Sequence, residues 1–139
     1  MTKPRNINIR NKEEIAGIRL ACQVTSQLLD EVGPIIEPGI STEDINTFVH
    51  NRTLELGGIP ATLNYHGFPK SVCTSPNNVI CHGIPDKDTI LVAGDILNVD
   101  ITNIKNGYYG DSSRMYFVGG REACSAEAVM LVEATKLAL

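Results

Sequence analysis

The dipeptide Asn-Gly at 106–107 stands between two runs of alternating polar and apolar residues, and it is the strongest structural signal in this sequence. Asn-Gly is strongly preferred in two-residue β-hairpin turns, because both positions of such a turn require a positive φ angle. Counting back from a two-residue turn pairs Asp100 with Ser113 on the facing strand. The sequence therefore predicts an antiparallel hairpin over residues 95–118 with a defined register.

Asp100 and Asp111 are predicted to lie on the same face of this hairpin, with Cβ atoms about 6 to 8 Å apart, because side chains alternate along a strand. A four-residue loop would also keep them on one face, whereas a three-residue loop without a bulge would separate them. Neighbouring carboxylates repel unless a proton or a metal ion neutralises them, and their oxygens suit a divalent cation. On spacing alone, two surface aspartates on a half-exposed hairpin are the more common case, so the residues alone leave both interpretations open.

Two helices are predicted before residue 59. Asn11 and Ser41 each precede an acidic residue by three positions, which is the spacing of a capping box at a helix start. Gly33-Pro34 and Gly57-Gly58 are the expected helix ends. The apolar face of the first helix is expected to comprise Ile15, Ile18, Cys22, Thr25, Leu29 and Val32, and that of the second Ile45, Phe48, Val49 and Leu56.

Residues 59–118 consist of short β-rich runs separated by turn residues, so we expect the middle of the chain to be mostly sheet. A third helix is predicted from Ser125, with Val129 and Val132 on its inner side. Its apolar pattern reaches Leu139 without a glycine, asparagine or proline to end it. We therefore expect one α+β unit over residues 1–139, cut short within a larger domain.

Composition excludes several classes of protein. The hydrophobic fraction of 42% and the charged fraction of 20% are those of a soluble globular domain. A net charge of -4 without a basic cluster argues against nucleic acid as a partner. The start lacks an apolar leader, and no stretch approaches the roughly 20 apolar residues of a membrane span, so we expect a cytoplasmic protein. The cysteines lack C-x-x-C spacing and are expected to be reduced: Cys22, Cys73, Cys81 and Cys124.

Histidine patterns are less informative than the paired aspartates. His82 stands beside apolar residues in VICHGIP, where a lone histidine is more often a satisfied structural group than a catalyst. His50, inside the second predicted helix, is interpreted as structural. His66, in the loop NYHGFP, remains open between the two interpretations.

Four segments, in order and at one family's spacing, resemble methionine aminopeptidases of the bacterial type, which are metallopeptidases of the pita-bread fold. The similarity runs through almost the whole chain, and CHGIP and NYHGFP favour this branch over prolidase-like members. The resemblance implies half of a pseudo-symmetric α+β fold: an antiparallel curved sheet with two helices packed on it and a third helix cut at the chain end. The segments are NYHGFPKSVCTS at 64–75, NNVICHGIPD at 77–86, GDILNVDIT at 94–102 and GYYGDSSRMYFVG at 107–119, with EEIAGIRLACQV at 13–24 in support.

The resemblance also implies roles for individual residues. Asp100 would bind one metal ion through both oxygens, Asp111 would bridge two ions, and His82 would contact substrate near the scissile bond and stabilise the tetrahedral intermediate. Thr102 would support a ligand by hydrogen bonding. The pocket for the methionine side chain would be lined by Thr62, Tyr65, His66, Phe68 and Cys73, and the backbone carbonyls of Asn77 and Val79 match an alkali-cation site found in some members.

The implied activity is hydrolysis that removes the initiator methionine from nascent proteins, a step of protein maturation. It would use two divalent metal ions, which could be cobalt, manganese, iron or zinc, and the ribosome is a partner to consider. The family's ligand set also includes one His and two Glu, which would lie beyond Leu139. The chain alone is thus expected to be inactive and to associate with the missing half or with a second copy.

The alternative is a non-catalytic peptide-binding or assembly module derived from the same fold. Retention of Asp100, Asp111 and His82 speaks against this alternative, because a scaffold has no reason to keep neighbouring like charges.

Overall fold

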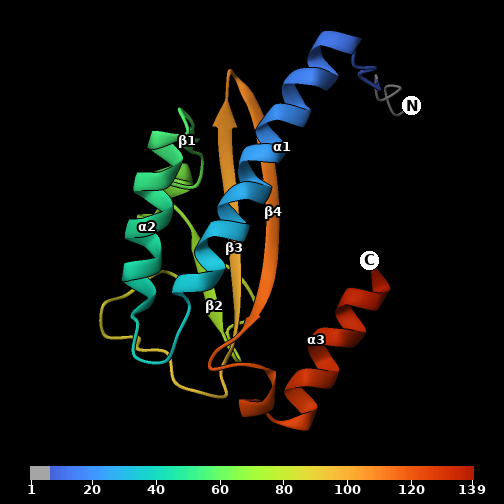
Figure 1. The fold of residues 1–139 in the computed structure, drawn as a ribbon. Coiled ribbons are helices and arrows are strands. Elements are labelled where there is room, and N and C mark those ends of the chain that lie inside the picture. Colours follow the sequence, from blue (N-terminus) through green and yellow to red (C-terminus); the bar gives the residue numbers. More distant parts are fainter. Residues whose placement is uncertain (1–6) are drawn as a thin grey trace, which may run out of the picture.

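A four-stranded antiparallel sheet forms the centre of the computed structural model, which describes residues 7–139 (Figure 1). Strand β3 pairs with all three other strands. The hairpin partner β4 lies along one edge of β3, and the two short strands β1 and β2 share its other edge. The strands are β1 (Ile59–Pro60), β2 (Cys73–Pro76), β3 (Ile96–Lys105) and β4 (Tyr108–Phe117).

Helices α1 (Lys12–Val32) and α2 (Thr42–Glu55) pack on one face of the sheet, whereas α3 (Ala126–Ala138) projects away from it (Figure 1). Three short 3-10 helices, η1 (Gly33–Ile35), η2 (Tyr65–Gly67) and η3 (Arg121–Ala123), lie in the connections. Among residues 7–139 no helix has the length and apolar character needed to cross a membrane. The expectation about a leader at the start of the chain falls partly on residues 1–6, which lie outside the described part.

The predicted hairpin register is confirmed. Asp100 pairs with Ser113, and Lys105 pairs with Tyr108 next to the turn. The turn residues Asn106 and Gly107 have φ angles of 53° and 82°, which are the positive values that a tight hairpin turn of this type needs. The polar face that carries Asp100 therefore lies opposite the face covered by α1 and α2.

Both predicted capping boxes are present. Asn11 accepts a hydrogen bond from the Glu14 backbone N–H at 2.9 Å, and the Glu14 carboxylate accepts one from the Asn11 backbone N–H at 2.8 Å. Ser41 and Asp44 form the same reciprocal pair at 3.1 and 3.0 Å. These caps satisfy N–H groups that the first turn of each helix leaves free, so both helices start where the sequence predicts.

The predicted apolar face of α1 is wrong in its first half. Ile15 is 46% exposed, because the first turn of α1 extends beyond the sheet (Figure 1). Cys22 is exposed although its backbone lies against Gly110 of β4. The second half of α1 lies on the sheet, and its buried residues are Ala21, Val24, Thr25, Leu28, Leu29 and Val32. In α2 the expectation is closer to the structure, since Ile45 and Val49 are buried and Phe48 and Leu56 are partly buried.

The expectation that residues 59–118 are mostly sheet is wrong for residues 77–95, which form a loop with a single isolated bridge between Ser41 and Ile90. The polar groups of this loop bond to the start of α2 instead of to a neighbouring strand. Asp86 exchanges two hydrogen bonds with the Thr42 hydroxyl, at 2.9 and 3.0 Å, and Thr89 accepts one from the Thr42 backbone N–H at 3.0 Å. These bonds hold the loop at the start of α2, and a bond from the Thr74 backbone N–H to the Gly83 carbonyl holds it beside β2.

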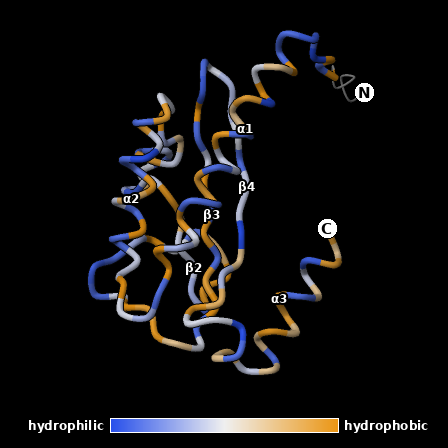
Figure 2. Tube along the Cα trace, in the orientation of Figure 1, coloured by the Kyte–Doolittle hydropathy of each residue, from blue (hydrophilic) through white to orange (hydrophobic). Residues whose placement is uncertain are grey.

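The hydrophobic core lies between β3 and the two packed helices, as the apolar segments of Figure 2 show. Helix α3 begins after Ser125 as predicted, with the Ser125 hydroxyl accepting from the Ala128 backbone N–H at 3.1 Å. None of its residues is buried, and Val129 and Val132 are only partly covered. The inner side expected for α3 therefore has no packing layer within residues 7–139.

Candidate active site

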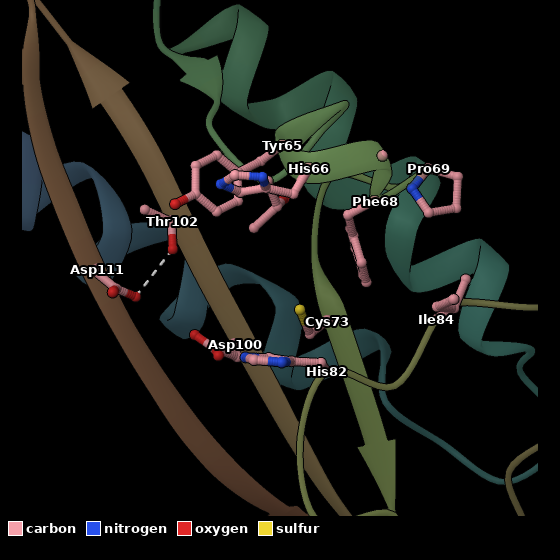
Figure 3. Close-up of a pocket in the computed structure, with 12 residues that line it drawn as sticks. Tyr65, His66, Phe68, Pro69, Cys73, His82, Ile84, Asp100, Thr102 and Asp111 are labelled. Carbon is pink, nitrogen blue, oxygen red and sulfur yellow. Dashed lines mark hydrogen bonds between the residues drawn. The ribbon is translucent and has the colours of Figure 1, made fainter.

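The hairpin aims both aspartates into one cavity of about 550 Å³ on the sheet face opposite the helices. Asp111 pairs directly with Thr102 across the hairpin, and Asp100 lies two residues before Thr102 on the same face of β3. The Thr102 hydroxyl donates a hydrogen bond to Oδ1 of Asp111 at 3.0 Å (Figure 3). In Figure 3 the Asp100 carboxyl group points toward the side of the cavity where Asp111 lies.

The surroundings of the cavity disfavour a state in which Asp100 and Asp111 both carry a negative charge. Burial raises the pKa of Asp100, and the neighbouring Asp111 raises it further, while His82 acts in the opposite direction. Burial also raises the pKa of Cys73 to about 11, with smaller contributions from Asp100 and Cys81. Cys73 is therefore a neutral thiol at neutral pH and is not a nucleophile in this state.

Strand β2 supplies the floor beside Asp100. Cys73 is the direct cross-strand partner of Asp100 and is 5% exposed, with its sulfur facing the cavity in Figure 3. Both residues therefore share one face of the sheet on neighbouring strands. This pairing is non-local in sequence and places a soft, polarisable atom next to a carboxylate.

A loop between β1 and β2 forms the opposite wall. Its 3-10 turn η2 presents Tyr65 and His66, whose rings meet edge to face with centroids 4.4 Å apart, and Phe68 follows directly (Figure 3). His66 has a φ of 47°, a left-handed conformation that is uncommon outside glycine and occurs at functional sites. The Thr62 hydroxyl at the start of this loop is buried and has no hydrogen-bond partner among residues 7–139, so it can accept or donate to a bound group.

The 77–95 loop brings His82 beside Asp100. His82 has a φ of 54°, and the next residue, Gly83, is tied to β2 by a hydrogen bond from the Thr74 backbone N–H at 2.9 Å. A Cβ on Gly83 would lie 2.0 Å from the Thr74 carbonyl oxygen, so only glycine permits this close approach. The glycine thus fixes the imidazole at the cavity (Figure 3).

The structure brings most of the predicted site residues together and leaves others apart. The lining of the cavity includes Thr62, Tyr65, His66, Phe68, Cys73, His82, Asp100, Thr102 and Asp111. Asn77 and Val79, predicted from the resemblance as a cation site, lie outside this lining. His50 also lies outside it and bonds Ser71, in agreement with its structural interpretation.

Sequence reasoning missed three lining residues, Gly67, Pro69 and Ile84. Each lies inside one of the segments that resemble methionine aminopeptidases. Ile84 follows His82 by two positions. Strand alternation does not indicate Ile84, because His82 has a φ of 54° and the segment lies in a loop. Tyr109 lines an adjoining cavity of about 390 Å³ with Ala61 and Asp111.

The aspartate pair provides part of a metal site. Asp100 and Asp111 offer the oxygen ligands that divalent cations accept, and a cation would offset both the burial and the Asp111 charge that raise the pKa of Asp100. Within residues 7–139 no group of three or more His, Cys, Asp or Glu side chains is arranged to hold a metal ion. In the described part of the chain, the site therefore offers a cation two carboxylates and no third ligand of these types.

The fold and the acidic cavity are those of a metallopeptidase. Residues 16–139 match the model of metallopeptidase family M24, so the chain belongs to this family. It is 46% identical over 134 residues to the methionine aminopeptidase of Haemophilus influenzae, covering 96% of this chain and 49% of that protein. It is also 46% identical over 127 residues to methionine aminopeptidase A of Synechocystis, covering 91% and 50%. The chain spans about half the length of the curated relatives it matches.

Solved structures agree with these relatives. The crystal structure of methionine aminopeptidase from Rickettsia prowazekii matches with a TM-score of 0.91 and 41% identity, over 96% of this chain and 52% of that chain. The Thermotoga maritima enzyme matches with a TM-score of 0.89 and 31% identity, over 95% and 52%. An X-Pro aminopeptidase at 16% identity shares the fold. The predicted resemblance and the α+β half of the pita-bread fold are confirmed.

Proposed function

We propose that this chain is the amino-terminal half of the catalytic domain of a metal-dependent methionine aminopeptidase. The observation that carries the proposal is the convergence of Asp100, Asp111 and His82 on one cavity whose far wall is built by Tyr65 and Phe68. Acidic ligands, a polar side chain for the reacting carbonyl and an apolar wall for a side chain are the three parts that cleavage after a terminal methionine needs.

Asp100 and Asp111 would hold divalent cations, two per complete site, of cobalt, manganese, iron or zinc. The chemistry supplied by such cations is polarisation of the scissile carbonyl and activation of water. Thr102 fixes one oxygen of Asp111 and leaves the other free to bind. Burial, and after it the neighbouring Asp111, raises the pKa of Asp100, which supports a role in which the two carboxylates bind a cation.

His82 would donate a hydrogen bond to the negative charge that develops on the carbonyl oxygen. Its place beside Asp100 supports this role, because a donor held rigidly near the reacting bond stabilises the transition state more than the ground state. The left-handed backbone of His82 and the close contact of Gly83 with β2 limit its freedom.

The wall formed by Tyr65, Phe68 and Ile84 would take the methionine side chain. The neutral Cys73 thiol and the unpartnered Thr62 hydroxyl add weakly polar groups that tolerate a thioether. His66 would contact the substrate from the same loop. A terminal methionine presented by a nascent chain in the cytoplasm, near the ribosome, is the substrate we infer.

The remaining ligands, one His and two Glu, would come from outside this chain. Helix α3 exposes Met130, Leu131 and Leu137, at 68%, 59% and 87%, and β4 has no strand paired on its outer edge within residues 7–139. Such uncovered apolar surface supports association with a second half, or with a second copy of this chain.

The test is calorimetric titration of the chain with Mn²⁺, with and without a second half containing the missing ligands, together with cleavage of a Met-Ala-Ser peptide. We expect weak binding and no cleavage by the chain alone, and tight binding with cleavage by the assembled protein. If the assembled protein binds the peptide without cleaving it, the proposed aminopeptidase activity is contradicted and the non-catalytic peptide-binding module is favoured. Tight dinuclear binding and turnover by the chain alone would contradict the incomplete site.

A further inference from the structure

The pocket loop of residues 62–70 has backbone hydrogen bonds that join residues of the loop to one another. The Asn64 backbone N–H donates to the Phe68 carbonyl at 2.7 Å, and the Phe68 backbone N–H donates to the Tyr65 carbonyl at 2.9 Å. At its start the chain is tied to β3, through the Ala61 backbone N–H and the Thr102 carbonyl at 2.9 Å. The other end of the loop runs through Ser71 into β2, where Cys73 pairs with Asp100. Contacts to Ser71 therefore act where the loop joins the sheet.

Two side chains of α2 bind Ser71 from the outer layer. Asn46 Oδ1 accepts a hydrogen bond from the Ser71 backbone N–H at 2.9 Å, and His50 Nδ1 and Ser71 Oγ are 2.8 Å apart in a second hydrogen bond. Asn46 and His50 are four residues apart on a helix and so project from the same face. Ser71 is 3% exposed and Asn46 is 9% exposed, so water cannot readily replace either bond.

The orientation of the Asn46 amide is fixed by Glu43. Asn46 Nδ2 donates to Glu43 Oε1 at 3.1 Å, and Glu43 Oε2 forms an ion pair with Lys70 Nζ at 2.6 Å. Because a carboxylate only accepts hydrogen bonds, the amide nitrogen must face Glu43 and the amide oxygen must face Ser71. The contacts form one directional network from α2 to the end of the pocket loop.

Ser71 lies between two residues that line the cavity, Phe68 three positions before it and Cys73 two positions after it. We propose that Asn46 and His50 are positioning residues: through Ser71 they form an α2 clamp that holds the pocket wall at a fixed separation from the aspartates and so sets which side chain the pocket accepts. The α2 clamp is a feature of the fold, whereas its effect on substrate selection rests on the proposed function.

Buried polar contacts are suited to this task. An apolar contact between α2 and the loop would tolerate sliding, whereas paired donors and acceptors have a single register and leave an unsatisfied group if displaced. Misplacement of a pocket wall by about 1 Å is enough to lower the catalytic efficiency kcat/KM of enzymes. The clamp therefore links the outer helix, which touches no substrate, to the shape of the site.

Cys73 provides a probe of the clamp that needs no activity. We would measure the rate of its reaction with a maleimide in the chain itself, by mass spectrometry of peptides, with exposed Cys22 as the internal reference. Asn46→Ala and His50→Ala should raise the Cys73 rate by about fivefold to tenfold through local opening and leave the Cys22 rate unchanged. His50→Gln, which can still bond the Ser71 hydroxyl, should restore most of the protection.

The matched control is Thr53→Ala, a buried position of the same helix whose hydroxyl donates to the Val49 carbonyl and does not touch Ser71. The Cys73 rate of each variant is measured at a temperature that lies the same number of degrees below its own unfolding midpoint. An equal rise in Cys73 reactivity for Thr53→Ala, or no rise in either clamp variant, would overturn the clamp. If Asn46→Ala does not fold, a double-mutant cycle of His50→Ala and Ser71→Ala replaces it, with non-additive rates expected and additive rates contradicting the proposal.

The effect on substrate is measured on the complete protein with Met-Ala-Ser and Leu-Ala-Ser peptides. His50→Ala should raise KM for the methionine peptide about fivefold and keep kcat within about twofold. It should also lower the ratio of kcat/KM for the methionine peptide to kcat/KM for the leucine peptide. An unchanged preference together with an unchanged KM would overturn the role in selection. If the unmodified protein cleaves neither peptide, the proposed function fails, and the Cys73 rates still decide the clamp.

Discussion

Thr102 donates its hydroxyl hydrogen bond to Oδ1 of Asp111, the residue directly opposite it on the hairpin, at 3.0 Å. This bond orients one carboxylate of the pair through one of its two oxygens. It joins the two strands on the face that also carries Asp100. The orientation of Asp111 is therefore set by the sheet before any ion binds.

Replacement of Thr102 by valine should weaken binding of Mn²⁺ to the assembled protein by about tenfold, because a ligand that loses its supporting hydrogen bond is no longer held in one orientation. The shape of the side chain is nearly unchanged, so the unfolding midpoint should stay close to that of the original protein. Calorimetric titration measures the affinity. Thr102→Ser, which keeps the hydroxyl, is the control, and equal affinity in both variants would contradict the role.

A methyl group at Gly83 should disturb the loop that carries His82. The Cβ of an alanine would lie 2.0 Å from the backbone carbonyl oxygen of Thr74, and backbone atoms cannot move away cheaply. We expect Gly83→Ala to lower the free energy of unfolding by about 1 to 3 kcal/mol, as overpacking does. Urea unfolding followed by circular dichroism measures this change.

Gly39→Ala is a comparison for that experiment, since no atom lies within 4 Å of a Cβ there, although its φ of 98° adds strain. A loss at Gly83 no larger than at Gly39 would mean that the loop can move away from β2.

Acid stability should depend on Asp44. Hydrogen bonds from the Ser41 hydroxyl and the Ser41 backbone N–H hold the pKa of the Asp44 carboxyl below its ordinary value of 3.8. A lowered pKa in the folded state adds stability that is fully present above the unfolded pKa and is lost as the pH falls through the folded value. Asp44→Asn keeps an acceptor but does not titrate.

The stability difference between the original protein and Asp44→Asn should therefore shrink as the pH falls from about 5 to about 2. Thermal unfolding over that pH range measures the difference. Parallel curves for the two proteins would show that the capping carboxylate contributes nothing through its charge.

Local chemistry explains what could be predicted from the sequence. The turn at 106–107 sets the whole register of β3 and β4, and the capping boxes at Asn11 and Ser41 set both helix starts, because each depends on residues close together in the chain. The shared face of Asp100 and Asp111 follows from that register alone. Their common cavity adds contacts from other segments that no local rule supplies.

Contacts between distant segments account for what sequence patterns missed. The bonds from Asn46 and His50 to Ser71 cross from a helix to a loop, and the pairing of Cys73 with Asp100 joins two strands separated by a long loop. The exposed Ile15 has an amphipathic pattern that is correct for a helix, but periodicity does not reveal how far the sheet extends beneath it.

The most direct test of the shared cation is Asp111→Asn in the assembled protein, measured by Mn²⁺ titration and by cleavage of Met-Ala-Ser. The substitution keeps the shape of the side chain and removes a like charge beside Asp100, so the protein should remain folded. We expect metal affinity to fall by at least about tenfold and turnover to be abolished. Unchanged affinity together with unchanged turnover would show that the two aspartates do not hold a common ion.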